Sequence, residues 1–85
     1  MIIVSQDKSV VVNFNNVEAI EIGNVEENQH KGTIYARLLS DYFYKIGEYS
    51  IEERAKEVLA EITEFWKNGA MSDYKGFICY EMPED

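Results

Sequence analysis

The pattern of apolar and polar positions separates a series of strands from one helix. The first β-branched runs, IIVS and SVVVNF, flank the polar tripeptide Gln6-Asp7-Lys8, which has the length of a hairpin turn. After Asn15-Asn16, the run VEAIEIG places Ile20 and Ile22 on one strand face and Glu21 on the other. These three runs predict a three-stranded antiparallel meander.

A second hairpin and a final strand continue the alternation. The segments TIYARLL and YFYKIGEY flank Ser40-Asp41, which predicts a hairpin over residues 33–46. The very polar stretch 24–32 joins this hairpin to the meander by a loop that is longer than hairpin loops usually are. Near the end, GFICYEMP predicts a strand over about 77–82 that stops at Pro83.

Between these strands the apolar period changes to that of a helix. Ser50 and Glu53 have the spacing of a capping box, Lys67 suits the negative end of the helix dipole, and Gly69 suits the C′ position. We therefore expect a helix over about 51–68. Its predicted core-facing residues recur at three- and four-residue steps: Ile51, Ala55, Val58, Leu59, Ile62, Phe65 and Trp66.

Together these elements predict the fold class. We expect a single α+β domain over residues 1–85, with a five-stranded antiparallel β-meander, the helix packed on one sheet face, and the final strand. The hydrophobic content of 46% is sufficient for a core in a chain of 85 residues.

Composition narrows the class of partner. Sixteen acidic and eight basic residues give a net charge of −8, and the basic residues are scattered along the sequence. Because nucleic-acid binding proteins present a clustered basic surface, we do not expect a nucleic-acid partner. The first residues lack the features of a signal peptide, and no apolar run is long enough to span a bilayer, so we expect no membrane partner and a cytoplasmic location.

The residue types that carry enzyme chemistry do not form a recognisable motif. His30 is the single histidine, and its neighbours Glu26 and Glu27 make a weak set for zinc or for acid–base catalysis. The single cysteine, Cys79, is interpreted as a small core residue of the last strand. We expect no catalytic, metal or cofactor site, and an enzyme that uses His30 is the less favoured hypothesis.

Four carboxylates follow one flank of the predicted helix: Glu53, Glu57, Glu61 and Glu64. One interpretation is a solvated helix face with favourable pairs such as Glu52–Lys56 and Glu64–Lys67. The other is an acidic surface that binds a basic protein as a decoy for nucleic acid. Carboxylates that face water lack the raised pKa that acid–base catalysis needs, so catalysis is disfavoured.

Six tyrosines are many for a chain of this length. Tyr42 and Tyr44 fall on one strand face, and Tyr35 lies across the predicted hairpin. If the helix covers one sheet face, several aromatics stand on the other, where they form either a partner surface or cross-strand pairs that stabilise the sheet.

Three stretches carry a resemblance to a known group of proteins. VSQDKSVVVNFNNV, IGEYSIEERAKEVLAEI and the ending YEMPE resemble short uncharacterised proteins of low-GC Gram-positive bacteria and their mobile elements. The resemblance spans nearly the whole chain and implies no activity and no functional residues, because no function is established for that group.

The leading functional hypothesis is therefore a non-enzymatic module that binds a protein partner or itself through the tyrosine-rich sheet face. A homodimer is expected because MIIVS and FICYEM read as edge strands with little charge to block pairing. Candidate partner-surface residues are Tyr35, Tyr42, Tyr44 and the four helix carboxylates.

Overall fold

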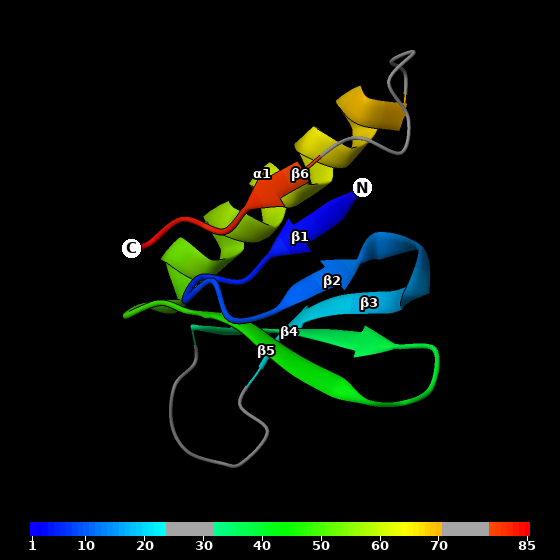
Figure 1. The fold of residues 1–85 in the computed structure, drawn as a ribbon. Coiled ribbons are helices and arrows are strands. Elements are labelled where there is room, and N and C mark those ends of the chain that lie inside the picture. The colour runs from blue at the N-terminus through cyan, green and yellow to red at the C-terminus, as the bar shows by residue number, and fades with distance from the viewer. Residues whose placement is uncertain (24–31, 71–78) are drawn as a thin grey trace.

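The computed structural model describes residues 1–23, 32–70 and 79–85, and within them the chain is α+β, as predicted. Figure 1 shows the arrangement of the elements. In chain order they are β1 (Ile2–Val4), β2 (Val11–Asn13), the 3-10 helix η1 (Phe14–Asn16), β3 (Val17–Ile22), β4 (Thr33–Leu38), β5 (Phe43–Glu48), α1 (Glu52–Ala70) and β6 (Cys79–Glu81).

The strands form two sheets, whereas a single five-stranded meander was predicted. One sheet has the order β2-β1-β6 and the other the order β3-β4-β5. The break falls at η1, where the side chain of Asn13 accepts a hydrogen bond from the amide of Asn15 at 2.9 Å. This local bond turns the chain out of β2, so that β3 begins a new sheet rather than continuing the first.

The β1–β2 hairpin was predicted correctly, and its turn is held by Asp7. The Asp7 carboxylate accepts hydrogen bonds from the amide of Ser9 at 3.0 Å, from the hydroxyl of Ser9 at 2.7 Å and from the hydroxyl of Ser5 at 2.9 Å. These donors favour the ionised form and lower the pKa of Asp7 to about 2, with the Ser9 hydroxyl as the largest cause. Lys8 takes a positive φ of 66° in this turn.

The last strand reaches back to the first. β6 pairs in parallel with β1, with Ile3 opposite Tyr80, and β1 therefore has a neighbour on each side. The prediction that MIIVS is an edge strand is wrong for this reason. Tyr80 and Met82 point into the core, while Cys79 is exposed, so the interpretation of Cys79 as a core residue is also wrong. Residues 77 and 78 of the predicted strand lie outside the described residues.

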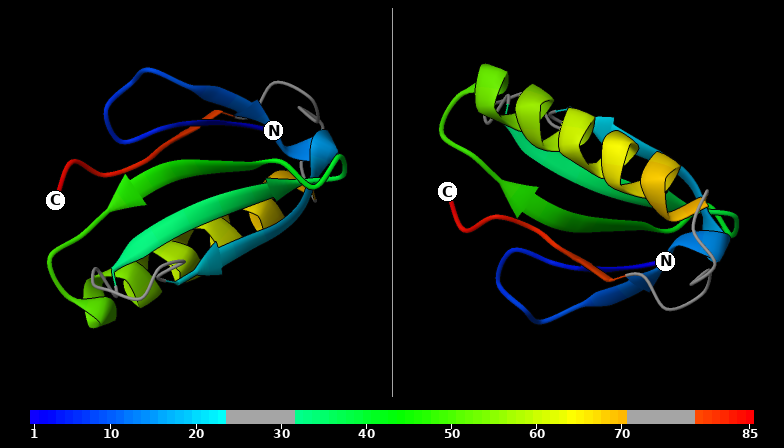
Figure 2. Two further views of the ribbon diagram at one scale, coloured as in Figure 1. Left: turned by 90° about the horizontal axis from the view of Figure 1, so that it is seen from below. Right: turned by 90° about the horizontal axis from the view of Figure 1, so that it is seen from above.

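The helix covers one face of the β3-β4-β5 sheet, and the β1–β2 hairpin and β6 lie to the side next to β5 (Figure 2). The faces that meet bury Ala55, Val58 and Ile62 from α1 against Ile34 and Ala36 of β4. This confirms the centre of the predicted core face.

Both ends of that predicted face stay outside the core. Ile51, Phe65 and Trp66 are exposed, with 46% of the Trp66 surface accessible. A helix of 19 residues is about 28 Å long, whereas a strand of six residues spans about 20 Å, so the last turns of α1 extend past the sheet. There Trp66 packs on Phe14 with ring centroids 6.0 Å apart, and Phe65 packs on Tyr80 at 5.3 Å.

Gln6 joins the two sheets. Its amide donates to the carbonyl oxygen of Ile46 at 2.8 Å, and its side-chain oxygen accepts from the amide of Glu48 at 2.7 Å. Its side-chain nitrogen donates to the main-chain oxygen of Glu84 at 2.8 Å. The outer edge of β5 is thereby occupied by the chain that leaves β1.

Among the described residues, no helix combines the length and apolar character needed to cross a membrane.

Candidate functional site

The three tyrosines of the predicted partner surface lie on different parts of the β3-β4-β5 sheet. Tyr44 stands opposite Ala36, so it lies on the side of the sheet that faces the helix and packs against the core. Tyr35 stands opposite Lys45 on the face that points away from the helix. Tyr42 is in the β4–β5 turn, with its ring centroid 5.0 Å from that of Tyr44. The sheet therefore does not gather the three rings on one face.

The face away from the helix combines aromatic rings with paired charges. Tyr35 packs edge-on against Phe43 with centroids 6.2 Å apart. Beside them, the guanidinium of Arg37 donates to Glu21 at 2.7 Å and to Glu18 at 3.3 Å. The hydrogen bond to Glu21 is the largest cause of the raised pKa of Arg37, which fixes the guanidinium as a cation shared by two carboxylates.

The β4–β5 turn exposes three large apolar side chains, which we name the turn patch: Leu39, Tyr42 and Phe43, with 66%, 59% and 47% of their surfaces accessible. The turn that carries them is hydrogen-bonded, because the amide of Leu38 donates to the carbonyl oxygen of Tyr42 at 2.8 Å and the amide of Asp41 donates to that of Leu38 at 2.8 Å. Asp41 takes a φ of 70° to close it.

Sequence reasoning found Tyr42 but missed Leu39 and Phe43 as surface residues. The available signal was their position on either side of the turn dipeptide Ser40-Asp41, because apolar side chains next to a turn have little sheet to pack against.

A groove of about 400 Å³ separates the second half of α1 from β3, and we name it the α1–β3 groove. Most of its lining is apolar: Phe14, Val17, Glu18, Ala19, Ile20, Leu59, Ile62, Thr63 and Trp66. The groove and the turn patch are neighbours, because the amide of Leu39 donates to the carbonyl oxygen of Asn16 at 3.0 Å. Sequence reasoning had placed Trp66 and Leu59 in the core and so gave no indication of this groove.

The helix carboxylates are exposed, as the sequence predicted, and most of them have a cation from the same chain nearby. Arg54 lies 3.1 Å from Glu57 and 3.8 Å from Glu61, and Lys67 lies 3.9 Å from Glu64. The predicted Glu52–Lys56 pair is also present, at 3.7 Å. Within the part of the chain that the structure describes, Glu53 is the member of the stripe without such a pair.

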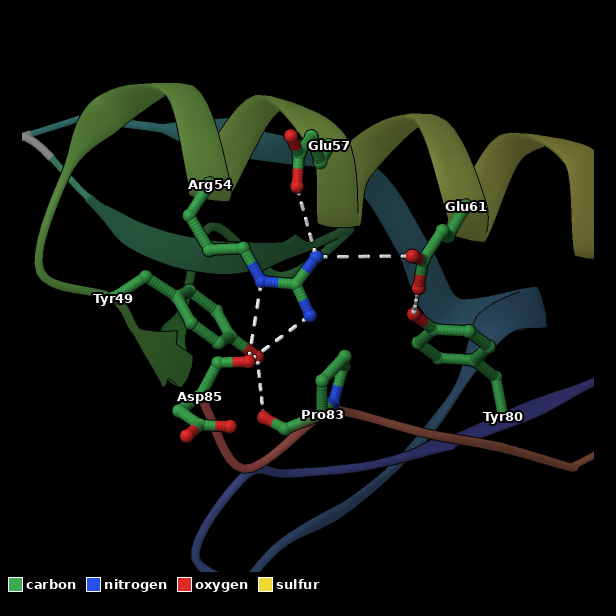
Figure 3. A network of polar contacts seen from close by, with 7 residues as sticks. All are labelled: Tyr49, Arg54, Glu57, Glu61, Tyr80, Pro83 and Asp85. Carbon is green, nitrogen blue, oxygen red and sulfur yellow. Dashed lines mark hydrogen bonds and ion pairs between the residues drawn. The ribbon is translucent and has the colours of Figure 1, made fainter.

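Arg54 is the centre of a polar network that fastens the C-terminal segment to the helix (Figure 3). Its guanidinium lies 5.9 Å from the ring centroid of Tyr49 and donates to the main-chain oxygen of Asp85 at 3.0 Å and 3.2 Å. The hydroxyl of Tyr49 donates to the main-chain oxygen of Pro83 at 2.8 Å. Burial is the main cause that raises the pKa of Tyr49 to about 12.

Tyr80 extends this network to Glu61. Its hydroxyl donates to the Glu61 carboxylate at 2.9 Å, and burial together with this bond raises the pKa of Tyr80 well above its usual value. Phenols held protonated and committed as donors to main-chain and carboxylate oxygens stabilise a fold rather than act as bases. We therefore assign the network a structural role.

The described residues contain no group of three or more His, Cys, Asp or Glu side chains placed to hold a metal ion. The less favoured catalytic set lies outside the described residues: His30, Glu26 and Glu27.

Comparison of the chain with protein-family models, with curated proteins and with solved structures found no match.

Proposed function

We propose that this protein is a protein-interaction module and that the turn patch is the centre of its binding surface. The observation that carries the proposal is the exposure of Leu39, Tyr42 and Phe43 within five consecutive residues. Isolated exposed apolar residues are ordinary on soluble proteins, whereas contiguous ones are typical of surfaces that bind other proteins. Aromatic residues are also enriched in the centres of such interfaces.

The geometry of the turn supports the same proposal. Its two main-chain hydrogen bonds restrain the backbone of the turn, so that less backbone entropy is lost when a partner binds. Tyr35, which packs on Phe43, extends the aromatic surface along the face away from the helix, and the Arg37 cluster forms a polar border beside it. Of the three predicted tyrosines, Tyr42 belongs to the turn patch and packs on Tyr44 on the helix side, whereas Tyr35 adjoins the patch through Phe43 on the other side.

The acidic-decoy hypothesis has weaker support. A decoy needs carboxylates that are available to a basic partner, but Glu57, Glu61 and Glu64 already have Arg54 or Lys67 within 4 Å. Each such exposed pair is worth little in energy, yet it reduces the negative potential that a partner would meet.

The test is affinity capture from an extract of the cells that make the protein. The first variant combines Leu39→Ser, Tyr42→Ser and Phe43→Thr, and the control variant combines Glu53→Gln, Glu57→Gln and Glu64→Gln on the helix. We expect a partner that stays bound at high salt, is lost with the turn-patch variant and is retained by the helix variant. A partner that high salt removes, and that the helix variant loses, would instead favour the decoy, because salt screens exposed charges.

A further inference from the structure

The two edges of the β3-β4-β5 sheet differ. At β5, Gln6 bonds to Ile46 through its main chain and to Glu48 through its side chain, so that edge is occupied. At β3, the described strands provide a neighbour on one side only, which is β4. An edge of this kind presents main-chain donors and acceptors that another extended chain can pair with.

The register tells which main-chain groups face outward. The amide of Gly23 donates to the carbonyl oxygen of Thr33 at 3.0 Å, and the pairing continues with Glu21 opposite Tyr35. In an antiparallel ladder, hydrogen-bonded pairs alternate with pairs that do not bond each other. Glu21 therefore bonds to β4, and the N–H and C=O groups of Ile20 and Ile22 point to the free edge.

The α1–β3 groove runs along this same edge. Four consecutive residues of β3, from Val17 to Ile20, line it, and the register of the strand shifts between Val17 and Ala19. Ala19 stands opposite Arg37, on the face away from the helix, so main-chain atoms of β3 contribute to the lining of the groove. Leu59, Ile62 and Trp66 form its helix wall, and its volume lies in the range of ligand-binding pockets.

The other side of the edge is acidic. Among the described residues, Arg37 is the cation that pairs with both Glu18 and Glu21, so two carboxylates face one guanidinium beside β3 in a chain whose net charge is −8. A strand added at this edge would direct alternate side chains to the helix side and to the acidic side. Apolar side chains fit the first side, and lysine or arginine fits the second.

We propose that the free edge of β3 and the α1–β3 groove bind an extended segment of a partner protein in which apolar residues alternate with lysine or arginine. This is recognition by strand addition, in which main-chain hydrogen bonds provide affinity and pockets for alternate side chains provide specificity. The inference rests on the proposed function and extends it, because the groove adjoins the turn patch through the Leu39–Asn16 hydrogen bond.

A second copy of this chain fits the edge less well than such a segment. The β3 strand of a copy has the sequence VEAIEI, which brings glutamates to the side of the edge that is already acidic. Like charges brought together across paired strands are destabilising. The homodimer stays a prediction; of its two predicted edge strands, β1 has a neighbour on each side, whereas β6 has a neighbour on one side only among the described strands.

The test uses short synthetic peptides and the full chain labelled for NMR spectroscopy. The probe peptide alternates lysine with isoleucine, and the control peptide alternates glutamate with isoleucine. We expect the lysine peptide to shift the amide signals of residues 17–22 and the indole signal of Trp66. We expect the glutamate peptide to leave them unchanged.

Two pairs of variants locate the binding. Thr63→Arg places a cation in the groove, and its control, Ala60→Arg, makes the same change of charge on the outer face of α1, at an exposed position that does not line the groove. Should Thr63→Arg fail to fold, Glu18→Lys reverses the charge at the edge, with Glu53→Lys as its control. We expect a loss of affinity of about tenfold or more for Thr63→Arg and Glu18→Lys, and wild-type affinity for both controls.

The outcomes separate this inference from the proposed function. Strand addition is supported if binding of the lysine peptide depends on Thr63 and Glu18 but not on the turn-patch substitutions. This outcome holds whether or not the turn patch binds a partner. Binding lost only with the turn-patch variant overturns strand addition and leaves the proposed function standing. Shifts in β3 that appear on raising the protein concentration without peptide, together with a doubled mass by light scattering, overturn it in favour of a second copy. Absence of any shift with the lysine peptide also overturns it.

Discussion

The side-chain oxygen of Gln6 accepts a hydrogen bond from the main-chain amide of Glu48 at 2.7 Å, and this bond connects the turn after β1 to the outer edge of β5. A side chain thus takes the place that a neighbouring strand would take. The same side chain bonds to the main-chain oxygen of Glu84, so one amide group connects both sheets and the C-terminal segment.

Replacing Gln6 by methionine should destabilise the fold. Methionine keeps the length and removes both polar atoms, which leaves the Glu48 amide without this acceptor. We expect the free energy of unfolding to fall by about 1–2 kcal/mol, measured by urea denaturation. Lys56→Met, at an exposed position of α1, is the control and should change it by less than about 0.5 kcal/mol. Equal effects of the two substitutions would show that the hydrogen bonds of the Gln6 side chain do not stabilise the fold.

Gly32 permits a close approach of two chain segments. A Cβ at this position would overlap the carbonyl oxygen of Tyr49, while the Gly32 carbonyl oxygen accepts from the Tyr49 amide at 2.9 Å. We expect Gly32→Ala to lower the free energy of unfolding by about 1–3 kcal/mol, because the backbone must shift to make room. Gly23→Ala is the matched control, because a Cβ at Gly23 meets nothing within 4 Å. Urea denaturation should show that the free energy of unfolding of the Gly23→Ala variant does not fall.

The Asp7 turn gives the protein a dependence on acidic pH. The pKa of this carboxyl is lowered to about 2 in the folded chain from 3.8, so its ionised form is favoured by folding. The resulting stability is fully present above about pH 4 and is lost as the pH falls through about 2. An NMR titration of the Asp7 carboxyl should give the low value. In Asp7→Asn this part of the acid dependence should be absent, and an unchanged acid profile would contradict the assignment.

Tyr49 gives a corresponding dependence at alkaline pH. Folding raises the pKa of its phenol to about 12, so stability is fully present below pH 10 and is lost as the pH rises through about 12. Ultraviolet titration of tyrosinate should show a late phase in which phenols ionise only as the protein unfolds. Tyr49→Phe should remove part of that late phase, and the remainder belongs to Tyr80, whose pKa is also raised. A late phase of unchanged amplitude in Tyr49→Phe would contradict the assignment.

Local elements could be predicted from the sequence because their causes are local. The helix was placed within about two residues of its observed ends, since its apolar steps act within one or two turns. The prediction of Gly69 as the C′ residue is wrong, because α1 continues through it to Ala70. The turns at Gln6-Asp7-Lys8 and Ser40-Asp41 were likewise visible in their residue types. The alternation of Ile20 and Ile22 with Glu21 gave the core face of β3 correctly.

Relationships across the sheets could not be predicted in the same way. The parallel pairing of β1 with β6 joins segments that are distant in the sequence. The alternation of apolar and polar residues in a strand does not indicate which other strand it pairs with. The exposure of Trp66 depends on a comparison of helix and strand lengths rather than on the helical period. The α1–β3 groove likewise had no signal in the sequence alone, because it lies between two elements that are distant in the sequence and depends on how far apart they pack.

The position of β6 has a consequence for protein synthesis. On the ribosome, β1 meets β2 within a few residues, but its other neighbour is made only after both hairpins and the helix. Closing so long a loop is slow, and until it closes one side of β1 is open to other nascent chains. The vulnerable interval therefore runs from the synthesis of β1 to the arrival of β6. Codons that slow elongation in this interval should raise the insoluble fraction of the protein.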